Sequence, residues 1–236
     1  MLAVTDCRIS DEAASALRRN GFQLLRMPPH PSLPHPVASH PDMLFFCGRN
    51  AIYCTTEYFS IAKQELQQIS ATCQKEIRAV SQSISHDYPF DILFNIAVVG
   101  ESAFCLKAHT ATEILSEEPF DFYSVKQGYT KCSVIPVDER SLITADASIA
   151  AVATRRGLDV LLLREQATDL QGYDTGFIGG ATSYSPYLQD PDIYFCGDLD
   201  THPQSREIRR FCAERNRTCI SLTQHPLQDI GTVFLF

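Results

Sequence analysis

Hydrophobic and polar positions alternate along this chain in an order that repeats: two short apolar strands, an amphipathic helix and a third strand. Two copies are clearest, over residues 128–164 and 172–222. The first copy predicts strands at CSVIPVD, SLITAD and LDVLLL, the last of them buried, and a helix at ASIAAVATRRG. The second predicts strands at GFIGGAT, DIYFCGD and TCISL and a helix at SREIRRFCAERN. A supersecondary unit that repeats predicts an architecture built by repetition.

Two less regular copies precede these. One has strands at HPDMLFF and AIYCTT and a helix at YFSIAKQELQQISATC, and the other has strands at DILFNIAVV, SAFCLKA and FDFYSV and a helix at HTATEILS. The chain opens with the helix ISDEAASALRRNG, for which Ser10 is the expected N-cap and Gly21 the expected stop. It ends with the strand IGTVFLF and no helix. We therefore expect the two ends to complete a fifth unit, with the last strand packed beside the first helix.

Nothing in the composition divides the chain. No Gly/Ser linker, charge block or low-complexity run occurs, so we expect one domain over residues 1–236. A proline-rich stretch at residues 27–41 should run extended over the surface or over a site.

Four motifs carry a resemblance to a known family: SHPDMLFF from Ser39, VKQGYTKCS from Val125, ITAD from Ile143 and GYDTGFIGG from Gly172. They are similar to those of an uncharacterised bacterial family with the pentein, or guanidino-group-modifying-enzyme, fold. The resemblance implies an α/β pentein propeller of about five ββαβ units around a pseudo-fivefold axis. It implies no reaction, because that family has no established activity and a fold alone does not give a function.

The net charge and the cysteine spacing indicate which classes of partner and cofactor to expect. The net charge of -8 argues against nucleic acid or an anionic membrane as a partner and is compatible with a small cationic ligand. No apolar run is long enough to span a bilayer and no signal peptide opens the chain, so a cytoplasmic location is expected. The nine cysteines form no CxxC or CxxH pair, and we expect neither a metal nor a cofactor.

A site is expected where the first strands of all units meet at the ring centre, because polar groups from different units converge only there. Aligning the units brings a common set of residues to that point: His40, Asp42, Asn95, Lys131, Cys132, Gly179, Gly180 and Asp229.

His40 and Asp42 form a His-x-Asp pair. If both lie in a strand, they face the same side. The resemblance to pentein hydrolases implies acid/base work and guanidinium binding for such a pair, although those enzymes carry it in a later unit. The alternative is that His40 ends the proline-rich loop and Asp42 caps a turn.

Lys131 and Cys132 are adjacent, and a nearby ammonium can lower the pKa of a thiol and make it a nucleophile. Neighbours in a regular strand face opposite sides, however, so the pair cooperates only across a bulge or turn. The alternative places Cys132 in the core, where burial would raise its pKa and block alkylating reagents. Gly179 and Gly180 would let backbone approach a ligand or a neighbouring chain closely.

Two functions stay open at this point. In the first, the chain binds a small cationic, arginine-like guanidino or amidino compound in a central pocket and modifies it as a hydrolase or amidinotransferase. Cys132 attacks, His40 moves the proton, and Asp42 and Asp229 hold the cation, with Asn95 and Lys131 completing the pocket. In the second, it is a non-catalytic binding or interaction protein. The second is favoured by the last unit, QDIGTVFLF, because pentein hydrolases carry their nucleophilic cysteine there and this segment has none.

Overall fold

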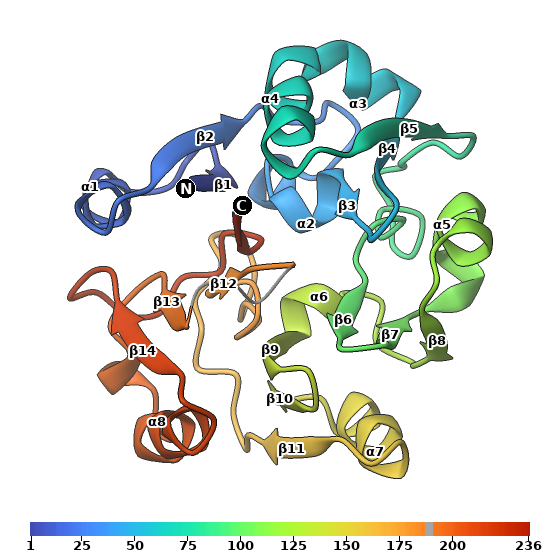
Figure 1. The fold of residues 1–236 in the computed structure, drawn as a ribbon. Coiled ribbons are helices and arrows are strands. Elements are labelled where there is room, and N and C mark those ends of the chain that lie inside the picture. The colour runs from blue at the N-terminus through green and yellow to red at the C-terminus, as the bar shows by residue number, and fades with distance from the viewer. Residues whose placement is uncertain (187–190) are drawn as a thin grey trace.

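Five small sheets surround the middle of the molecule (Figure 1). The computed structural model describes residues 1–186 and 191–236. The longer helices lie on the outside of the ring of sheets, and the two chain ends meet near its centre, where the Leu2 N–H donates to the Phe236 carbonyl over 2.7 Å.

Three units have the predicted order of a hairpin, a helix and a third strand. In each, the first two strands are antiparallel and the third runs parallel to the second. Their elements are β3 (Phe46–Cys47), β4 (Ala51–Thr55), α3 (Thr56–Ile61), α4 (Lys63–Cys73) and β5 (Glu76–Val80); β6 (Ala97–Val99), β7 (Ser102–Cys105), α5 (Thr112–Glu117) and β8 (Asp121–Ser124); and β9 (Val134–Asp138), β10 (Ser141–Thr144), α7 (Ala147–Arg155) and β11 (Asp159–Leu162).

The two chain ends complete a further unit, as the sequence predicts. Strand β15 (Val233–Leu235) pairs antiparallel with β1 (Leu2–Asp6), and β1 pairs parallel with β2 (Gln23–Met27) after helix α1 (Asp11–Arg19). Leu17 of α1 lies in one hydrophobic cluster with Val233 and Leu235. The expected cap is present, because the Ser10 hydroxyl accepts a hydrogen bond from the Ala13 N–H at 3.2 Å.

The fourth unit departs from the repeat. Strand β12 (Ser183–Tyr184) pairs with β15, whereas β13 (Asp192–Phe195) and β14 (Thr218–Ser221), joined by α8 (Ser205–Ala213), form a separate two-stranded sheet. Among the residues that the structure describes, the expected hairpin is represented by an isolated bridge from Thr182 to Phe195. The sheets therefore contain two to four strands each, so the units are related in order but not identical.

Several predicted strands are wrong in part. HPDMLFF begins with the short helix α2 (Pro41–Leu44), and CSVIPVD begins inside the short helix α6 (Thr130–Ser133). Of DILFNIAVV only the last three residues form a strand, β6, and most of GFIGGAT is turn. Pro41 suits a first helical position because its fixed φ and missing N–H cost nothing there. The strand LDVLLL forms as β11 but is not buried: it lies at a sheet edge, and Leu162 is 46% exposed.

The proline-rich segment is less extended than expected, because it contains the 3₁₀ turn η1 (His35–Val37). Two further 3₁₀ turns are η2 (Lys107–His109) and η3 (Leu199–Thr201).

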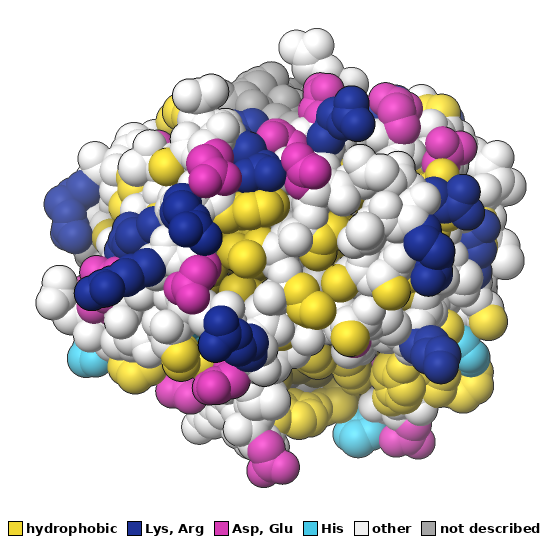
Figure 2. Space-filling view, turned by 90° about the horizontal axis from the view of Figure 1, so that it is seen from below, with side chains coloured by type: hydrophobic (Ala, Val, Ile, Leu, Met, Phe, Trp, Pro, Cys, Tyr) yellow, Lys and Arg dark blue, Asp and Glu magenta, His cyan; other side chains and the backbone are white. Residues whose placement is uncertain are grey.

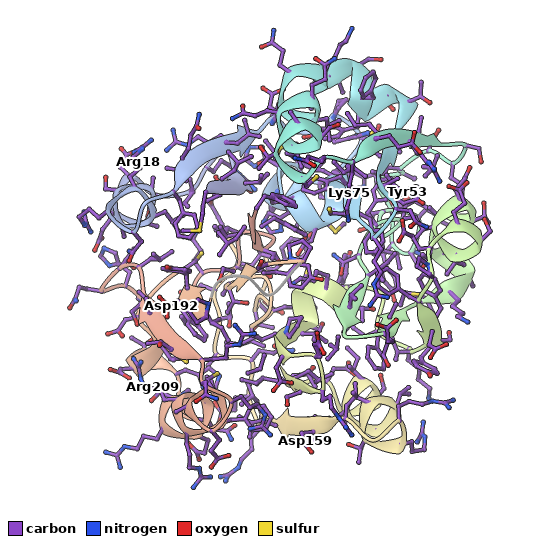
Figure 3. All side chains as sticks on the ribbon, in the orientation of Figure 1. Arg18, Tyr53, Lys75, Asp159, Asp192 and Arg209 are labelled. Carbon is purple, nitrogen blue, oxygen red and sulfur yellow. The ribbon has the colours of Figure 1, made fainter. Side chains whose placement is uncertain are left out.

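Charged side chains mark the periphery. Arg18, Asp159 and Arg209 lie at the outer rim, while side chains fill the space between the sheets (Figure 3). Acidic and basic side chains lie beside one another over much of the face in Figure 2. No helix within the described residues is long and apolar enough to cross a membrane.

Candidate functional site

The Asn95 side chain holds helix α6 in place from another unit. Its Oδ1 accepts hydrogen bonds from the backbone N–H of Lys131 at 2.6 Å and of Cys132 at 3.3 Å. The first N–H groups of a helix have no partner within the helix, and Asn95 supplies one here. The short helix turns both side chains inward, so Lys131 and Cys132 are both buried. The strand geometry that would have separated them is therefore absent.

A hydrogen-bonded network joins four segments at the centre. Asp42 Oδ2 accepts from Cys132 Sγ at 3.1 Å and from Thr232 Oγ1 at 2.9 Å. Lys131 Nζ donates to Thr232 Oγ1 at 3.2 Å and lies 5.0 Å from the centroid of the Tyr184 ring. Asn95 Nδ2 lies 3.1 Å from Cys132 Sγ. These contacts bring Asp42, Asn95, Lys131 and Cys132 together, as the sequence predicts.

Burial dominates the protonation of this network. It lowers the pKa of Lys131 to about 8 and raises the pKa of Asp42, because a charged group loses hydration inside the protein. The second carboxylate oxygen of Asp42, Oδ1, is buried without a hydrogen-bond partner. Both shifts move the pair toward its neutral forms.

Thr232 occupies a strained position. Its φ is +68°, which a β-branched residue rarely adopts. Such strain persists only where the surrounding structure enforces it, and here the hydroxyl links Asp42 to Lys131.

A cavity of about 160 Å³ lies against this network. His40, Cys132 and Asp229 line it together. The remaining lining residues are mostly apolar or aromatic: Val37, Met43, Tyr129, Leu170, Tyr173, Thr175 and Phe177. Because Val37 belongs to the proline-rich segment, that segment does cover the site.

The expectation that Asp42, Asn95 and Lys131 also line the cavity is wrong. Within the described part of the chain they lie outside its lining, in the network behind Cys132. For Asp42 the cause is the helix α2: His40 precedes it as the extended N-cap residue, whereas Asp42 lies on the helix and its side chain contacts Thr232.

Asp229 is the carboxylate that reaches the cavity. Its Oδ2 accepts from the Phe177 N–H at 2.9 Å and its Oδ1 from the Gly231 N–H at 3.0 Å. Burial nevertheless raises its pKa, while nearby His40 opposes the rise. The carboxylate is therefore held in a fixed orientation.

His40 lies between two carboxylates. Its Nδ1 is 3.9 Å from Asp229 Oδ1 and its Nε2 is 3.7 Å from Asp6 Oδ2. Burial lowers the pKa of His40, although both carboxylates oppose the shift, so the imidazole is neutral near pH 7. Asp6 accepts hydrogen bonds from Arg8 and Ser39. Burial acts to raise the pKa of Asp6, but these hydrogen bonds and the nearby His40 lower it overall.

The Cys132 thiol is not activated by Lys131. Burial raises the pKa of Cys132 well above its ordinary value, and the charges of Asp42 and Asp229 raise it further. The Lys131 ammonium is directed to Thr232 instead. Of the two alternatives that the sequence leaves open, the structure agrees with the one that places Cys132 in the core.

Three glycines let the backbone pack tightly around the site. A Cβ on Gly180 would lie 2.0 Å from Asp229 Oδ1, and one on Gly231 would lie 2.1 Å from the His40 Cβ. A Cβ on Gly179 would meet carbonyl oxygens of α6 and β9 at 2.4 to 2.7 Å. Gly179 and Gly180 thus allow close approach of neighbouring backbone and position Asp229, and they do not line the cavity.

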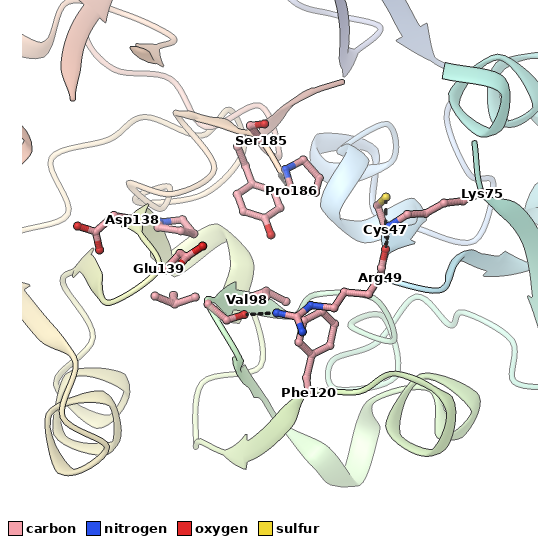
Figure 4. A pocket seen from close by; sticks show the side chains of 14 residues that line it. Cys47, Arg49, Lys75, Val98, Phe120, Asp138, Glu139, Ser185 and Pro186 are labelled. Atoms are coloured by element: carbon pink, nitrogen blue, oxygen red, sulfur yellow. Dashed lines mark hydrogen bonds between the residues drawn. The ribbon is translucent and has the colours of Figure 1, made fainter. Parts of the chain in front are cut away.

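A second cavity of about 170 Å³ lies at the other end of the first strands (Figure 4). Its lining includes Cys47, Val99, Asp138 and Ser185, which end or follow β3, β6, β9 and β12. The first cavity is lined by segments that precede such strands. Tyr184 lines the second cavity and packs on Lys131, so the buried network separates the two.

Sequence reasoning gave no role to Asp6, Tyr129, Phe177 or Thr232. The alignment of units reaches Thr232, but its hydroxyl contacts to Lys131 and Asp42 join residues more than 100 positions apart. Tyr129 and Phe177 lie inside the motifs GYTKCS and GYDTGFIGG, and their place in these motifs was the one sign in the sequence that they could belong to a site.

Comparisons with known proteins agree with this geometry at the level of the fold. The sequence pattern of a family of unknown function, DUF6873, matches residues 4–234. No curated protein matches the chain in sequence.

Three solved structures show the similarity in fold. DDAH from Pseudomonas aeruginosa, solved as a mutant complexed with citrulline, gives a TM-score of 0.58 at 10% identity over 93% of this chain and 91% of that one. An amidinotransferase of the saxitoxin biosynthetic pathway from Microseira wollei gives 0.54 at 10% identity over 89% and 73%. The inosamine-phosphate amidinotransferase of Streptomyces griseus gives 0.52 at 11% identity over 92% and 77%. The chain therefore has the mixed α/β pentein fold.

The described residues contain no group of three or more His, Cys, Asp or Glu side chains arranged to hold a metal ion.

Proposed function

The chain belongs to DUF6873, a family of unknown function, and from its central cavity we propose that it binds a small guanidino or amidino cation at Asp229. The observation that carries the proposal is one buried carboxylate facing an otherwise mostly apolar and aromatic cavity. A carboxylate and a guanidinium can form two parallel hydrogen bonds. Partial desolvation inside the cavity strengthens that attraction.

Aromatic rings complete the fit. The Tyr129 and Phe177 rings both line the cavity, with centroids 5.8 Å apart. A planar guanidinium stacks on aromatic faces through its charge and its delocalised electrons. The neutral His40 beside Asp229 leaves the position of the counter-ion open to a ligand.

The fold supports the same ligand class, since the similar structures include DDAH and two amidinotransferases. At 10 to 11% identity this similarity concerns the fold, and the proposal depends on the cavity.

Binding without catalysis is the form of the proposal that the geometry favours. The Cys132 thiol is buried, donates to Asp42 and has a raised pKa, so it is protonated near pH 7. The C-terminal segment QDIGTVFLF also lacks a cysteine.

A second candidate is an enzyme of the hydrolase or amidinotransferase type, and one observation favours it: Cys132 and His40 line the same cavity. In that reaction the thiol would lose its proton to His40 and attack the amidine carbon. An amine would then leave, and water or a second amine would release the product.

Binding is tested by calorimetry and thermal shift with simple guanidines and amidines. A ligand that binds only the native state raises the unfolding midpoint. We expect saturable binding, and we expect Asp229→Asn to weaken it at least tenfold. Asp174→Asn is the matched control, because Asp174 is exposed and outside the cavity lining. Absence of binding, or equal loss in both variants, would overturn the proposal.

The enzyme candidate has a separate test. Intact-protein mass spectrometry after incubation with ligand detects an adduct on Cys132, and an amine assay detects release of product. Turnover that disappears in Cys132→Ala would establish the catalytic form. Binding without adduct or turnover would leave the binding form.

A further inference from the structure

We infer that the preferred ligand of this cavity carries a single positive charge and an uncharged, apolar remainder, as an alkyl- or arylguanidine does. The inference rests on the proposed function and specifies its ligand class. It separates such compounds from arginine-like amino acids, which carry a carboxylate and an ammonium besides the guanidinium.

The charged side chains that line the cavity determine which ligand charges it can accept. Asp229 is the only acidic side chain among the lining residues that the structure describes, and no Lys or Arg is among them. His40, the remaining titratable base of the lining, is held neutral by burial. A ligand carboxylate would therefore enter the cavity without a counter-charge, and an unpaired buried charge is costly. A second ammonium would likewise find no second carboxylate.

Apolar side chains form much of the rest of the cavity lining. Val37, Met43, Leu170 and Phe177 contribute hydrocarbon or ring surface to the cavity. Its volume of about 160 Å³ corresponds to about five water molecules at ~30 Å³ each. That space holds a guanidinium group and a short chain, and the walls around the chain are hydrophobic.

Aromatic side chains extend from the cavity to the surface. The Tyr88 ring lies 5.4 Å from the Tyr129 ring, and the Tyr129 ring lies 5.8 Å from Phe177. Tyr88 is 49% exposed, and Tyr173, which lines the cavity, is 48% exposed. Large aromatic side chains left in solvent beside a cavity are typical of a surface that binds an apolar group. The ligand's remainder would cover these rings.

A series of four ligands tests the inference by calorimetry on the full chain. Butylguanidine has the cation and the bare chain, agmatine adds an ammonium, and arginine adds an ammonium and a carboxylate. Butylurea keeps the shape of butylguanidine without its charge. We expect butylguanidine to bind at least tenfold more tightly than arginine, with agmatine between them, and butylurea to bind least.

The outcomes separate this inference from the proposed function. Arginine binding as tightly as butylguanidine would overturn the inference and leave the guanidinium site standing. Butylurea binding as tightly as butylguanidine would overturn both, because the cation would then contribute nothing. Failure of all four ligands to bind would also overturn both.

A variant at the mouth gives an independent measurement. Tyr173→Ala removes an exposed ring of the lining and should weaken phenylguanidine binding about fivefold, the size of a typical aromatic contact, with less effect on guanidinium itself. Ile61→Ala is the control, since Ile61 is exposed on α3, away from the cavity. Equal affinities for phenylguanidine in the wild type and in Tyr173→Ala would count against an apolar remainder at this mouth.

Discussion

Cys132 shows how single residues at this site are governed by their surroundings. Its thiol is buried between Asn95 and Asp42, and the negative charges of Asp42 and Asp229 oppose its ionisation. Cys73 has the opposite setting: a hydrogen bond from Cys47 and the nearby Lys75 lower its pKa to about 7, and its side chain is half-buried. The same functional group is thus set up for different reactivity at two positions.

The contrast predicts the order of alkylation. With iodoacetamide at pH 7, Cys73 should react early because much of it is thiolate, whereas Cys132 should stay unmodified up to pH 9 and react only after unfolding in urea. Peptide mass mapping after brief labelling measures both sites. Cys73→Ser serves as the control for the assignment. Labelling of native Cys132 at the rate of Cys73 would contradict the raised pKa and strengthen the enzyme candidate.

At the scale of elements, helices capped by their own sequence differ from helices capped by another unit. Helix α7 has a local cap, because Asp146 Oδ1 accepts from the N–H groups of Ser148 and Ile149 at 2.8 Å each. The four-residue helix α6 depends instead on Asn95, which lies in the preceding unit. Local side-chain caps begin α1, α3 and α7, whereas a residue of another unit holds the start of the helix that carries the site.

Asp146→Ala should therefore lower the free energy of unfolding by about 1 kcal/mol, with ~2 kcal/mol as the upper range. Asp146→Asn should retain most of the wild-type free energy of unfolding, because an amide oxygen accepts the same hydrogen bonds. Urea denaturation followed by circular dichroism measures both variants. A loss in Asp146→Asn as large as in Asp146→Ala would show that charge, rather than capping, is responsible.

For the whole molecule, the joining of the two chain ends is the decisive contact. Strand β15 pairs with β1 and with β12, and Phe234 packs against Phe45 of the first complete unit at a ring separation of 5.0 Å. Phe234 is buried in the largest hydrophobic cluster although it is the third residue from the end of the chain. Removing it should affect every unit that meets at the centre.

Phe234→Ala should destabilise the protein by about 3–5 kcal/mol, the usual cost of a large cavity in a core. If residues 1–236 form one domain, as we propose, the loss should appear as a single cooperative transition shifted to lower temperature. Leu162→Ala on the exposed edge β11 is the control and should change stability by about 0.5 kcal/mol or less. Two separate transitions in calorimetry of the variant would contradict a single domain.

The repeated elements and the pairing of the two chain ends could be predicted from the sequence alone. Apolar spacing predicts α1, α7 and α8 and the middle strands because these elements bury one face wherever they are placed. The chain opens with a helix that has no hairpin before it, and it ends with a strand that has no helix after it. This predicted that β15 joins the unit of α1. Equivalent positions in successive units also predicted that His40, Cys132 and Asp229 converge.

Contacts between distant segments determine which of the converging residues face the cavity. Asn95 holds the first N–H groups of the helix at residues 130–133, and Asp42 accepts a hydrogen bond from Thr232, 190 positions away in the chain. The hydrophobic pattern of one segment cannot predict the hydrogen bonds that it will form with a distant segment. The direction of each side chain, and with it the choice of Asp229 over Asp42 as the carboxylate in the cavity, is fixed by those distant contacts.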